Sequence, residues 1–301
     1  MKITWNGVYP AITTKFTQDG QLDMQAYAAN IQQQIEAGID GIIVAGSLGE
    51  TSTLTKEERF LVTEETIRLC KGKIPVLLNI AEQSTREAVA IAQRAEEIGA
   101  EGLMLLPPMR YKADDRETVE YFKTIAQASS LPVMIYNNPV DYGIKVTLAM
   151  FDELLKLDNV QAVKESTRDI TNITRYKNTF GDRMKILCGV DTLALESLAA
   201  GADGWVAGLV CAFPRETVAI YRLMKAGRTE EALKIYRWFM PLLELDIHPK
   251  LIQYIKLAEA QVGMGTEHVR APRLPLIGEE KERILKIIQD ALAIRPELPT
   301  V

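Results

Sequence analysis

The stretch Ala37-Gly38-Ile39-Asp40-Gly41-Ile42-Ile43-Val44-Ala45 joins a glycine-containing turn directly to a short apolar run. The same arrangement recurs at residues 98–106 and again at residues 200–207. Glycine readily adopts the left-handed conformation that closes many helices, so each turn predicts the end of a helix and the start of a strand. The repeated turn therefore divides the chain into units in which helices and strands alternate.

Short apolar runs continue this alternation on both sides of the quoted stretch, and eight of them are predicted as strands. They cover residues 7–14, 41–45, 75–80, 102–106, 132–136, 160–164, 185–188 and 204–207. Helical patterns, such as those at residues 24–37, 56–69 and 85–98, separate the strands, and strands separated by helices pair in parallel. Eight such units predict an α/β fold of one closed (β/α)8 TIM barrel.

The main structural alternative is an open, doubly wound sheet. Such a sheet usually carries a glycine-rich dinucleotide-binding loop after its first strand. Residues 10–14, Pro-Ala-Ile-Thr-Thr, contain no glycine. The barrel is therefore favoured.

Beyond Pro214 the sequence predicts only helices. Two of them cover residues 249–262 and 279–294, and a proline-containing loop at residues 271–276 lies between them. We therefore expect a catalytic barrel over residues 1–225 and a C-terminal helical extension over residues 226–301 that packs on the barrel.

The composition restricts the classes of function. Hydrophobic residues make up 47% of the 301 residues, and Lys and Arg number 35 against 40 Asp and Glu, so the net charge of −5 predicts no nucleic-acid surface. No segment approaches the roughly 18 apolar residues of a membrane span. The three cysteines, Cys70, Cys188 and Cys211, favour reduced thiols in the cytoplasm. The two histidines, His248 and His268, predict no zinc site and are assigned to packing or surface hydrogen bonds.

Polar side chains follow several predicted strands, at the end of a barrel where active sites gather. Lys164 ends one strand and Tyr136 ends its neighbour. A lysine that is desolvated in the barrel mouth can attack a carbonyl as a neutral amine, and a tyrosine beside it can relay protons. The structural alternatives are a surface lysine in a salt bridge and a tyrosine that packs in the barrel.

The loop Gly46-Ser47-Leu48-Gly49 follows the second predicted strand and precedes a helix. Its hydroxyl and backbone amides suit a carboxylate, the group that a keto acid would present. The alternative is that Ser47 only caps the local backbone.

Four motifs together resemble the dihydrodipicolinate synthase and N-acetylneuraminate lyase superfamily. They are Gly-Ser-Leu-Gly-Glu at 46–50, Tyr-Asn-Asn-Pro at 136–139, Lys-Glu-Ser at 164–166 and Gly-Val-Asp at 189–191. The likeness covers nearly the whole chain and extends to residues 7–14 and 270–276.

The resemblance implies a class I lyase that acts on a small 2-keto or 2-imino acid. In it, Lys164 forms the Schiff base, and Tyr136 is the acid/base residue. Ser47 with the Leu48 amide holds the substrate carboxylate, and Ser47 is also a catalytic residue that moves protons together with Tyr136. Further substrate-binding candidates from the same motifs are Gly189, Asn138 and Asp141. The resemblance also implies a homotetramer and a reaction that needs no metal or organic cofactor.

Three positions depart from the pattern that is usual in dihydrodipicolinate synthases. Leu48 stands where a second threonine is usual, Met109 where an aromatic residue is usual, and Val140-Asp141 where an arginine is usual. An acidic residue in place of a carboxylate-binding arginine would repel an anionic second substrate. Lysine biosynthesis is therefore disfavoured.

Residues 106–112 and 135–142 look like the branch that degrades hydroxyproline and deaminates Δ1-pyrroline-4-hydroxy-2-carboxylate to 2,5-dioxopentanoate and ammonia. Two alternatives use the same lysine: a 2-keto-3-deoxy sugar acid dehydratase and a pyruvate-dependent aldolase. A non-catalytic keto-acid sensor is a third alternative, but binding alone does not need a lysine paired with a tyrosine.

Overall fold

The computed structural model describes residues 3–108 and 110–300. Eight strands form one parallel sheet, as the alternating pattern predicts. The strands are β1 (Gly7–Pro10), β2 (Ile42–Val44), β3 (Val76–Ile80), β4 (Gly102–Leu105), β5 (Val133–Asn137), β6 (Val160–Glu165), β7 (Lys185–Cys188) and β8 (Gly204–Ala207).

The sheet closes between its first two strands. Hydrogen bonds join the strands in the order β1-β8-β7-β6-β5-β4-β3-β2. A parallel bridge pairs Ala11 with Ile43, and the Ile12 amide donates to the Ile43 carbonyl at 3.0 Å. The prediction of a (β/α)8 TIM barrel with C-terminal helices is confirmed.

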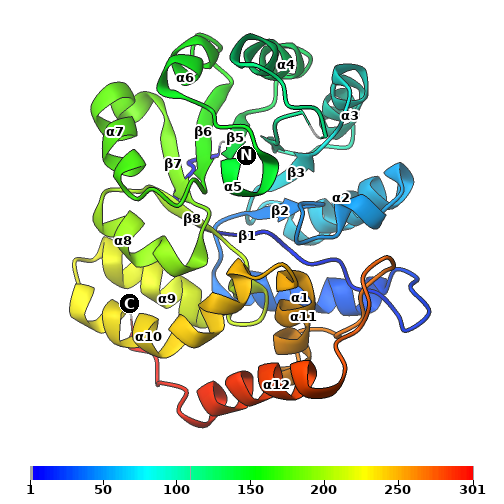
Figure 1. Ribbon diagram of the computed structural model, residues 1–301, viewed down its shortest axis with the longest axis vertical. Helices are drawn as coiled ribbons and strands as arrows, with labels where there is room; N and C mark the ends of the chain where they lie inside the picture. The colour runs from blue at the N-terminus through cyan, green and yellow to red at the C-terminus, as the bar shows by residue number, and fades with distance from the viewer. Residues whose placement is uncertain (1–2, 109, 301) are drawn as a thin grey trace.

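The helices surround the barrel, and the last three lie together on one side of it (Figure 1). The α-helices are α1 (Met24–Ala37), α2 (Lys56–Cys70), α3 (Thr85–Glu97), α4 (Asp115–Gln127), α5 (Pro139–Tyr142), α6 (Leu148–Leu154), α7 (Thr171–Phe180), α8 (Ala194–Ala199), α9 (Pro214–Lys225), α10 (Thr229–Leu243), α11 (Leu251–Gln261) and α12 (Gly278–Ala293). Short 3-10 helices are η1 (Thr51–Thr53), η2 (Gly181–Arg183), η3 (Asp191–Leu193), η4 (Leu209–Cys211) and η5 (Glu244–Ile247).

The turn at residues 37–41 behaves as its glycines predict. Gly38 has φ +84° and its amide donates to the Gln34 and Ile35 carbonyls, which ends α1. Gly41 packs against Tyr9 so closely that an added Cβ would lie 2.2 Å from a Tyr9 ring carbon. The turn can therefore deliver the chain directly into β2.

Two predicted strands are longer in the sequence pattern than in the structure. The strand predicted at residues 7–14 ends at Pro10, because Thr13 and Thr14 turn their hydroxyls to Glu259 Oε1 and the Gly49 carbonyl. The strand predicted at residues 41–45 ends at Val44, because Ala45 has φ +56°, which is incompatible with a strand. The other predicted strands and helices agree with the structure to within two residues at each end, and β7, β8 and α1 have the predicted limits.

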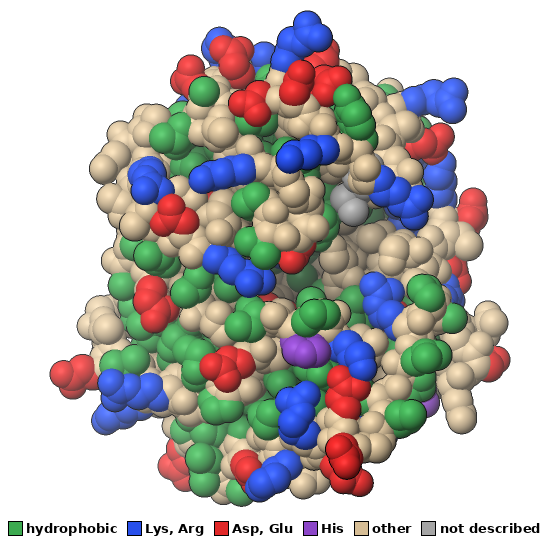
Figure 2. Space-filling view, viewed as in Figure 1, with side chains coloured by type: hydrophobic (Ala, Val, Ile, Leu, Met, Phe, Trp, Pro, Cys, Tyr) green, Lys and Arg blue, Asp and Glu red, His purple; other side chains and the backbone are tan. Residues whose placement is uncertain are grey.

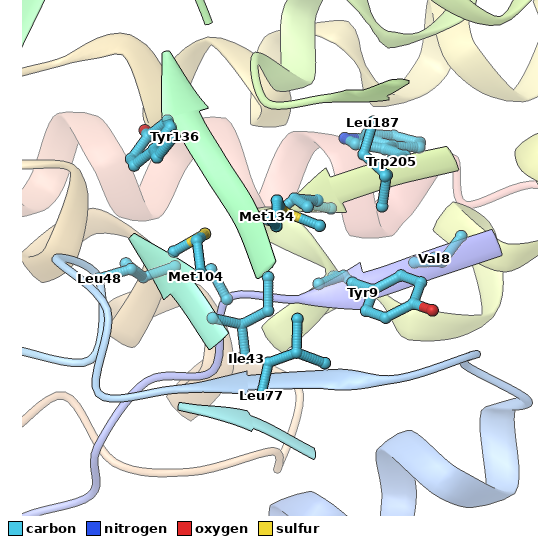
Figure 3. Packing of buried hydrophobic residues seen from close by; sticks show 14 of the residues in the cluster. Val8, Tyr9, Ile43, Leu48, Leu77, Met104, Met134, Tyr136, Leu187 and Trp205 are labelled. Atoms are coloured by element: carbon cyan, nitrogen blue, oxygen red, sulfur yellow. The ribbon is translucent and has the colours of Figure 1, made fainter. Parts of the chain in front are cut away.

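The barrel interior is filled with side chains. Large apolar residues from different strands meet there, among them Ile43, Leu77 and Met134 (Figure 3). Tyr136 and Leu48 lie at the end toward which the strands point. The interior is therefore a packed core, and active sites of such barrels lie at that end.

Buried ion pairs join the C-terminal helices to the barrel. Lys15 Nζ lies 2.7 Å from Glu259 Oε1 on α11, and Lys256 Nζ on α11 lies 2.5 Å from Glu50 Oε1. All four side chains are fully buried. The predicted boundary at residues 225 and 226 falls in the turn between α9 and α10.

Candidate active site

The carboxyl ends of the strands surround a cavity of about 100 Å³. Each predicted site residue lines it, namely Ser47, Leu48, Tyr136, Asn138, Asp141, Lys164 and Gly189. The face of the molecule in Figure 2 is hollowed near its middle. The fold thus brings together residues that are up to 142 positions apart in the sequence.

Lys164 lies near the end of β6 and is paired in register with Tyr136 on β5. Its Nζ lies 4.1 Å from the centre of the Tyr136 ring, and the residue is 7% exposed. Burial lowers the pKa of Lys164, although the nearby Tyr142 and Asp246 oppose the shift. A lower pKa makes the neutral, nucleophilic amine more accessible.

The structure does not match the alternative of a surface lysine. Lys164 is buried and makes no ion pair with any residue in the described part of the chain. A buried lysine without a paired carboxylate is uncommon in a purely structural role.

The Tyr136 phenol is positioned by Asn138, whose Nδ2 donates to the phenol oxygen at 3.0 Å. Burial is the main cause that raises the pKa of Tyr136, and contacts with Asn138 and Ser166 partly oppose it. The phenol therefore keeps its proton at neutral pH, and it can donate a proton or relay one beside Lys164.

Asn138 also fixes its own turn. Its Oδ1 accepts from the Asp141 amide at 3.2 Å, which caps the short helix α5, and its Nδ2 donates to Asp141 Oδ2 at 2.6 Å. Asp141 is exposed at the rim of the cavity. The contacts of Asn138 are therefore those of a positioning residue for Tyr136 and Asp141.

The loop after β2 holds Ser47 and Leu48 in a strained turn. Ala45 and Glu50 on either side have φ of +56° and +55°. The Ser47 and Leu48 amides donate no hydrogen bond to residues 3–108 or 110–300. The Ser47 hydroxyl lies 2.5 Å from the Tyr142 hydroxyl. Free amides beside a hydroxyl fit the predicted carboxylate-binding role.

Gly189, directly after β7, makes room for the lysine. A Cβ at this position would lie 2.7 Å from Cγ and Cε of Lys164 and 2.2 Å from Ser166 Oγ. Any larger residue here would displace the Lys164 side chain. The geometry thus explains why glycine stands at this position.

Four polar side chains of the cavity were not predicted as site residues from the sequence: Tyr142, Ser166, Arg168 and Asp246. Ser166 and Arg168 follow β6, so their place after a strand end was a usable signal. Tyr142 lies on α5 and was included only in the stretch 135–142 that resembles the hydroxyproline branch, without a role of its own. Asp246 lies in η5 of the C-terminal extension, where no strand end indicates a site.

Asp191, in the fourth motif, supports the wall of the cavity. Its carboxylate accepts from Trp205 Nε1 and the Leu209 amide, both at 2.8 Å, and from the Gly208 amide. It thereby fixes the chain that leaves β8. Burial raises the pKa of Asp191, although these donors oppose the shift.

Other residues named in the sequence analysis either do not line the cavity or lie outside the described residues. His248 stacks on Tyr254 with ring centres 4.6 Å apart. Cys188 is buried, its thiol donates to the Val190 carbonyl, and burial raises its pKa to about 12. Met109 lies outside the described residues. In residues 3–108 and 110–300, no group of three His, Cys, Asp or Glu side chains is placed to hold a metal ion, and no helix could span a membrane.

A second cavity of about 610 Å³ lies next to the first and shares Ser47, Asp141, Tyr142 and Leu251 with it. Its other lining residues include Arg59, Arg110 and Arg273. The Ser47–Tyr142 hydroxyl pair therefore stands between the small cavity at Lys164 and this wider space.

Comparison with known proteins identifies the family. The model of the dihydrodipicolinate synthetase family matches residues 4–291. The chain belongs to this family. The 4-hydroxy-tetrahydrodipicolinate synthase of Exiguobacterium sibiricum is 31% identical over 280 residues, which cover 92% of this chain and 94% of that protein. An uncharacterized DapA-like lyase of Rhizobium meliloti is 30% identical, with 95% and 97% covered.

The fold of a solved family member is the same. The crystal structure of dihydrodipicolinate synthase from Aquifex aeolicus has a TM-score of 0.90 and 28% identity, with 95% of this chain and 97% of that chain covered. The predicted superfamily is confirmed, and family membership supports a class I lyase, an enzyme that works through a lysine Schiff base. The hydroxyproline branch remains a prediction.

Proposed function

We propose that the chain deaminates Δ1-pyrroline-4-hydroxy-2-carboxylate to 2,5-dioxopentanoate and ammonia, with Lys164 as the covalent nucleophile. Three features of the cavity support this reaction: the buried lysine, the phenol of Tyr136 beside it, and the free amides of Ser47 and Leu48. They match the nucleophile, the acid/base group and the carboxylate pocket that such a substrate needs.

The proposed reaction uses these groups in order. Neutral Lys164 attacks C2 of the ring imine and displaces the ring nitrogen, and Tyr136 relays protons in this exchange. The protonated lysine imine then draws electrons from C3, which loses a proton. The 4-hydroxyl leaves as water and a C3–C4 double bond forms. A proton shift moves this double bond to an imine between C5 and the former ring nitrogen. Hydrolysis at C5 frees ammonia, and hydrolysis at C2 frees Lys164 and the dioxo acid.

The observation that carries the choice of substrate is the small cavity with carboxyls on its wall. Its volume of about 100 Å³ is well below the roughly 300–1,000 Å³ of sites for drug-sized ligands, so it suits a small ring. Asp141 and Asp246 both line it. The Asp141 carboxylate disfavours a pair of anionic substrates, and the Asp246 carboxyl can meet the departing hydroxyl of a substrate that carries one carboxylate.

One observation favours a second candidate. Arg168 also lines the cavity and makes no ion pair within the described residues. Arg168 therefore supplies a cation for a second anionic substrate, which the predicted repulsion by Asp141 did not take into account. A condensation like that named for the synthase relatives is the second candidate, with Arg168 as the group that would hold the second carboxylate.

A product assay separates these reactions. The enzyme is incubated with the hydroxypyrroline carboxylate, with a 2-keto-3-deoxy sugar acid, with pyruvate alone, and with pyruvate plus aspartate semialdehyde. We expect ammonia release from the first mixture only. Consumption of both components of the last mixture would establish the synthase candidate and refute the deaminase. Turnover of the sugar acid without ammonia would establish the dehydratase alternative, and cleavage of an aldol would establish the aldolase.

The assembly and the location are also proposals. We propose a homotetramer in the cytoplasm, on the resemblance and the reduced cysteines. Sedimentation velocity of the purified protein tests the homotetramer, and a mass near four times 33.6 kDa is expected. Fractionation of the source cells tests the location.

A further inference from the structure

The C-terminal extension contributes a carboxyl group to the catalytic cavity. Asp246 lies in η5, which follows α10, yet it lines the same cavity as Lys164. It packs on the backbone after β8, where a Cβ on Gly208 would lie 2.4 Å from Asp246 Oδ1. The absence of a side chain at Gly208 therefore leaves the space that the carboxyl occupies.

Asp246 differs in its contacts from Asp141, which also lines the cavity, and from Asp191, which is buried behind the cavity wall. Asp191 accepts hydrogen bonds from the backbone after β8, and Asp141 accepts one from Asn138. Asp246 makes no hydrogen bond or ion pair with residues 3–108 or 110–300. Its oxygens are therefore available to a substrate.

The barrel order places Asp246 and Tyr136 on different sides of the lysine. Tyr136 lies on β5, which borders β6 on one side. Asp246 packs after β8, which is reached from β6 through β7 on the other side. A substrate bound to Lys164 would thus meet a phenol on one side and a carboxyl on the other.

We propose that Asp246 is the acid that protonates the departing hydroxyl of the substrate. The inference rests on the proposed function, in which a hydroxyl leaves C4 of a lysine-bound imine. The enamine electron pair between C2 and C3 forms the double bond between C3 and C4, and the imine is restored at C2. The C4–O bond breaks, its electron pair goes to oxygen, and the Asp246 proton completes a water molecule. The Asp246 carboxylate then takes its next proton from solvent.

This role requires a protonated carboxyl. Burial and the nearby Asp191 raise the pKa of Asp246 well above its usual range, whereas Lys164 and Arg168 lower it. Five titratable or charged groups interact electrostatically with Asp246. They are Tyr136 on β5, Asp141 on α5, Lys164 on β6, Arg168 after β6 and Asp191 in η3. Because the acid form is the active one, the elimination rate should fall as pH rises through this pKa.

The test compares Asp246→Asn, which keeps the shape of the side chain, with Glu244→Gln, a matched change at an exposed residue of the same turn. Three rates are measured for each variant: borohydride trapping of pyruvate on Lys164, ammonia release from the hydroxypyrroline carboxylate, and fluoride release from its 4-fluoro analogue. Fluoride departs as an anion and needs no proton, so its release isolates the proposed step.

We expect Asp246→Asn to trap pyruvate within about twofold of wild type and to lose about 100-fold in kcat on the hydroxy substrate with little change in KM. Asp246→Asn should keep most of the fluoride release, and its elimination rate should no longer decline at high pH. Glu244→Gln should match wild type in all three rates. Equal loss of water and fluoride elimination, or an unchanged kcat on the hydroxy substrate, would overturn the role of Asp246 alone. A wild-type enzyme that traps pyruvate on Lys164 but eliminates no hydroxyl from any candidate would overturn the proposed function together with it.

Discussion

Gly189→Ala tests whether the position of the Lys164 side chain limits the reaction. The new Cβ would lie 2.7 Å from two carbons of Lys164, and ordinary van der Waals contact begins near 3.4 Å. The lysine side chain must therefore move by about 0.7 Å or more. Ser166 Oγ, at 2.2 Å from the same Cβ, must move as well.

The expected magnitude follows from this displacement. Overpacking of a dense core costs about 1–3 kcal/mol of folding free energy. A misplacement of about 1 Å in a reacting group can lower the rate about 100-fold. We therefore expect Gly189→Ala to fold with a melting temperature a few degrees lower and to lose about 100-fold in kcat.

Gly102→Ala is the matched control. Its Cβ would lie 2.7 Å from Ile3 Cδ1, but Gly102 stands at the first residue of β4, at the opposite end of the barrel from the cavity. Thermal melts and steady-state kinetics are measured for both variants. Similar losses of melting temperature with activity lost only in Gly189→Ala support the account. Wild-type kcat in Gly189→Ala, or an equal loss in Gly102→Ala, would refute it.

Three further outcomes are expected. Lys256→Met removes the buried ion pair with Glu50 and leaves that carboxylate to the Arg270 amide at 3.1 Å and the Arg273 guanidinium at 3.6 Å, so it should destabilise the fold by about 3 kcal/mol in chemical denaturation. Burial lowers the pKa of Lys256 to about 8 in the folded protein, so between about pH 8 and pH 10 the unfolded chain binds more protons than the folded one. The free energy of unfolding of wild type minus that of Lys256→Met should therefore increase with pH in that window. A difference that decreases would contradict this. Thiol reagents should leave turnover largely intact because Cys188 is buried and its pKa is raised to about 12, and inactivation that Cys188→Ser prevents would show the opposite. Tyr142→Phe removes the hydroxyl beside Ser47 and should weaken carboxylate binding, which would be measured as a several-fold higher KM. An unchanged KM for a keto acid would show that the Tyr142 hydroxyl does not contribute to substrate binding.

Much of the barrel could be predicted because its units repeat. Each turn such as residues 37–41 marks a helix end, and the apolar run after it marks a strand. The limits of β1 and β2 could not be predicted in this way. Residues 11–14 are apolar or β-branched like a strand, but a buried contact with Glu259, more than 240 positions away, determines their course. The left-handed conformation of Ala45 likewise depends on tertiary packing.

The candidate site likewise contains residues that could be predicted from the sequence and residues that could not. Lys164 and Tyr136 were predictable because they end strands, and strand ends in a parallel barrel meet on one face. Asp246 was not, because the fold of the C-terminal helices over the barrel brings it to the cavity. Arg168 follows β6 but lies beyond the Lys-Glu-Ser motif at 164–166, so the motif did not indicate it.

The central claim is that Lys164 forms a covalent imine with the hydroxypyrroline carboxylate. The most direct measurement is borohydride reduction of the enzyme during turnover, followed by digestion and mass mapping, with Lys164→Arg as the control. The account predicts one reduced adduct, located at Lys164, together with ammonia release, and neither in Lys164→Arg. An adduct at another lysine, or ammonia release at the wild-type rate by Lys164→Arg, would contradict it.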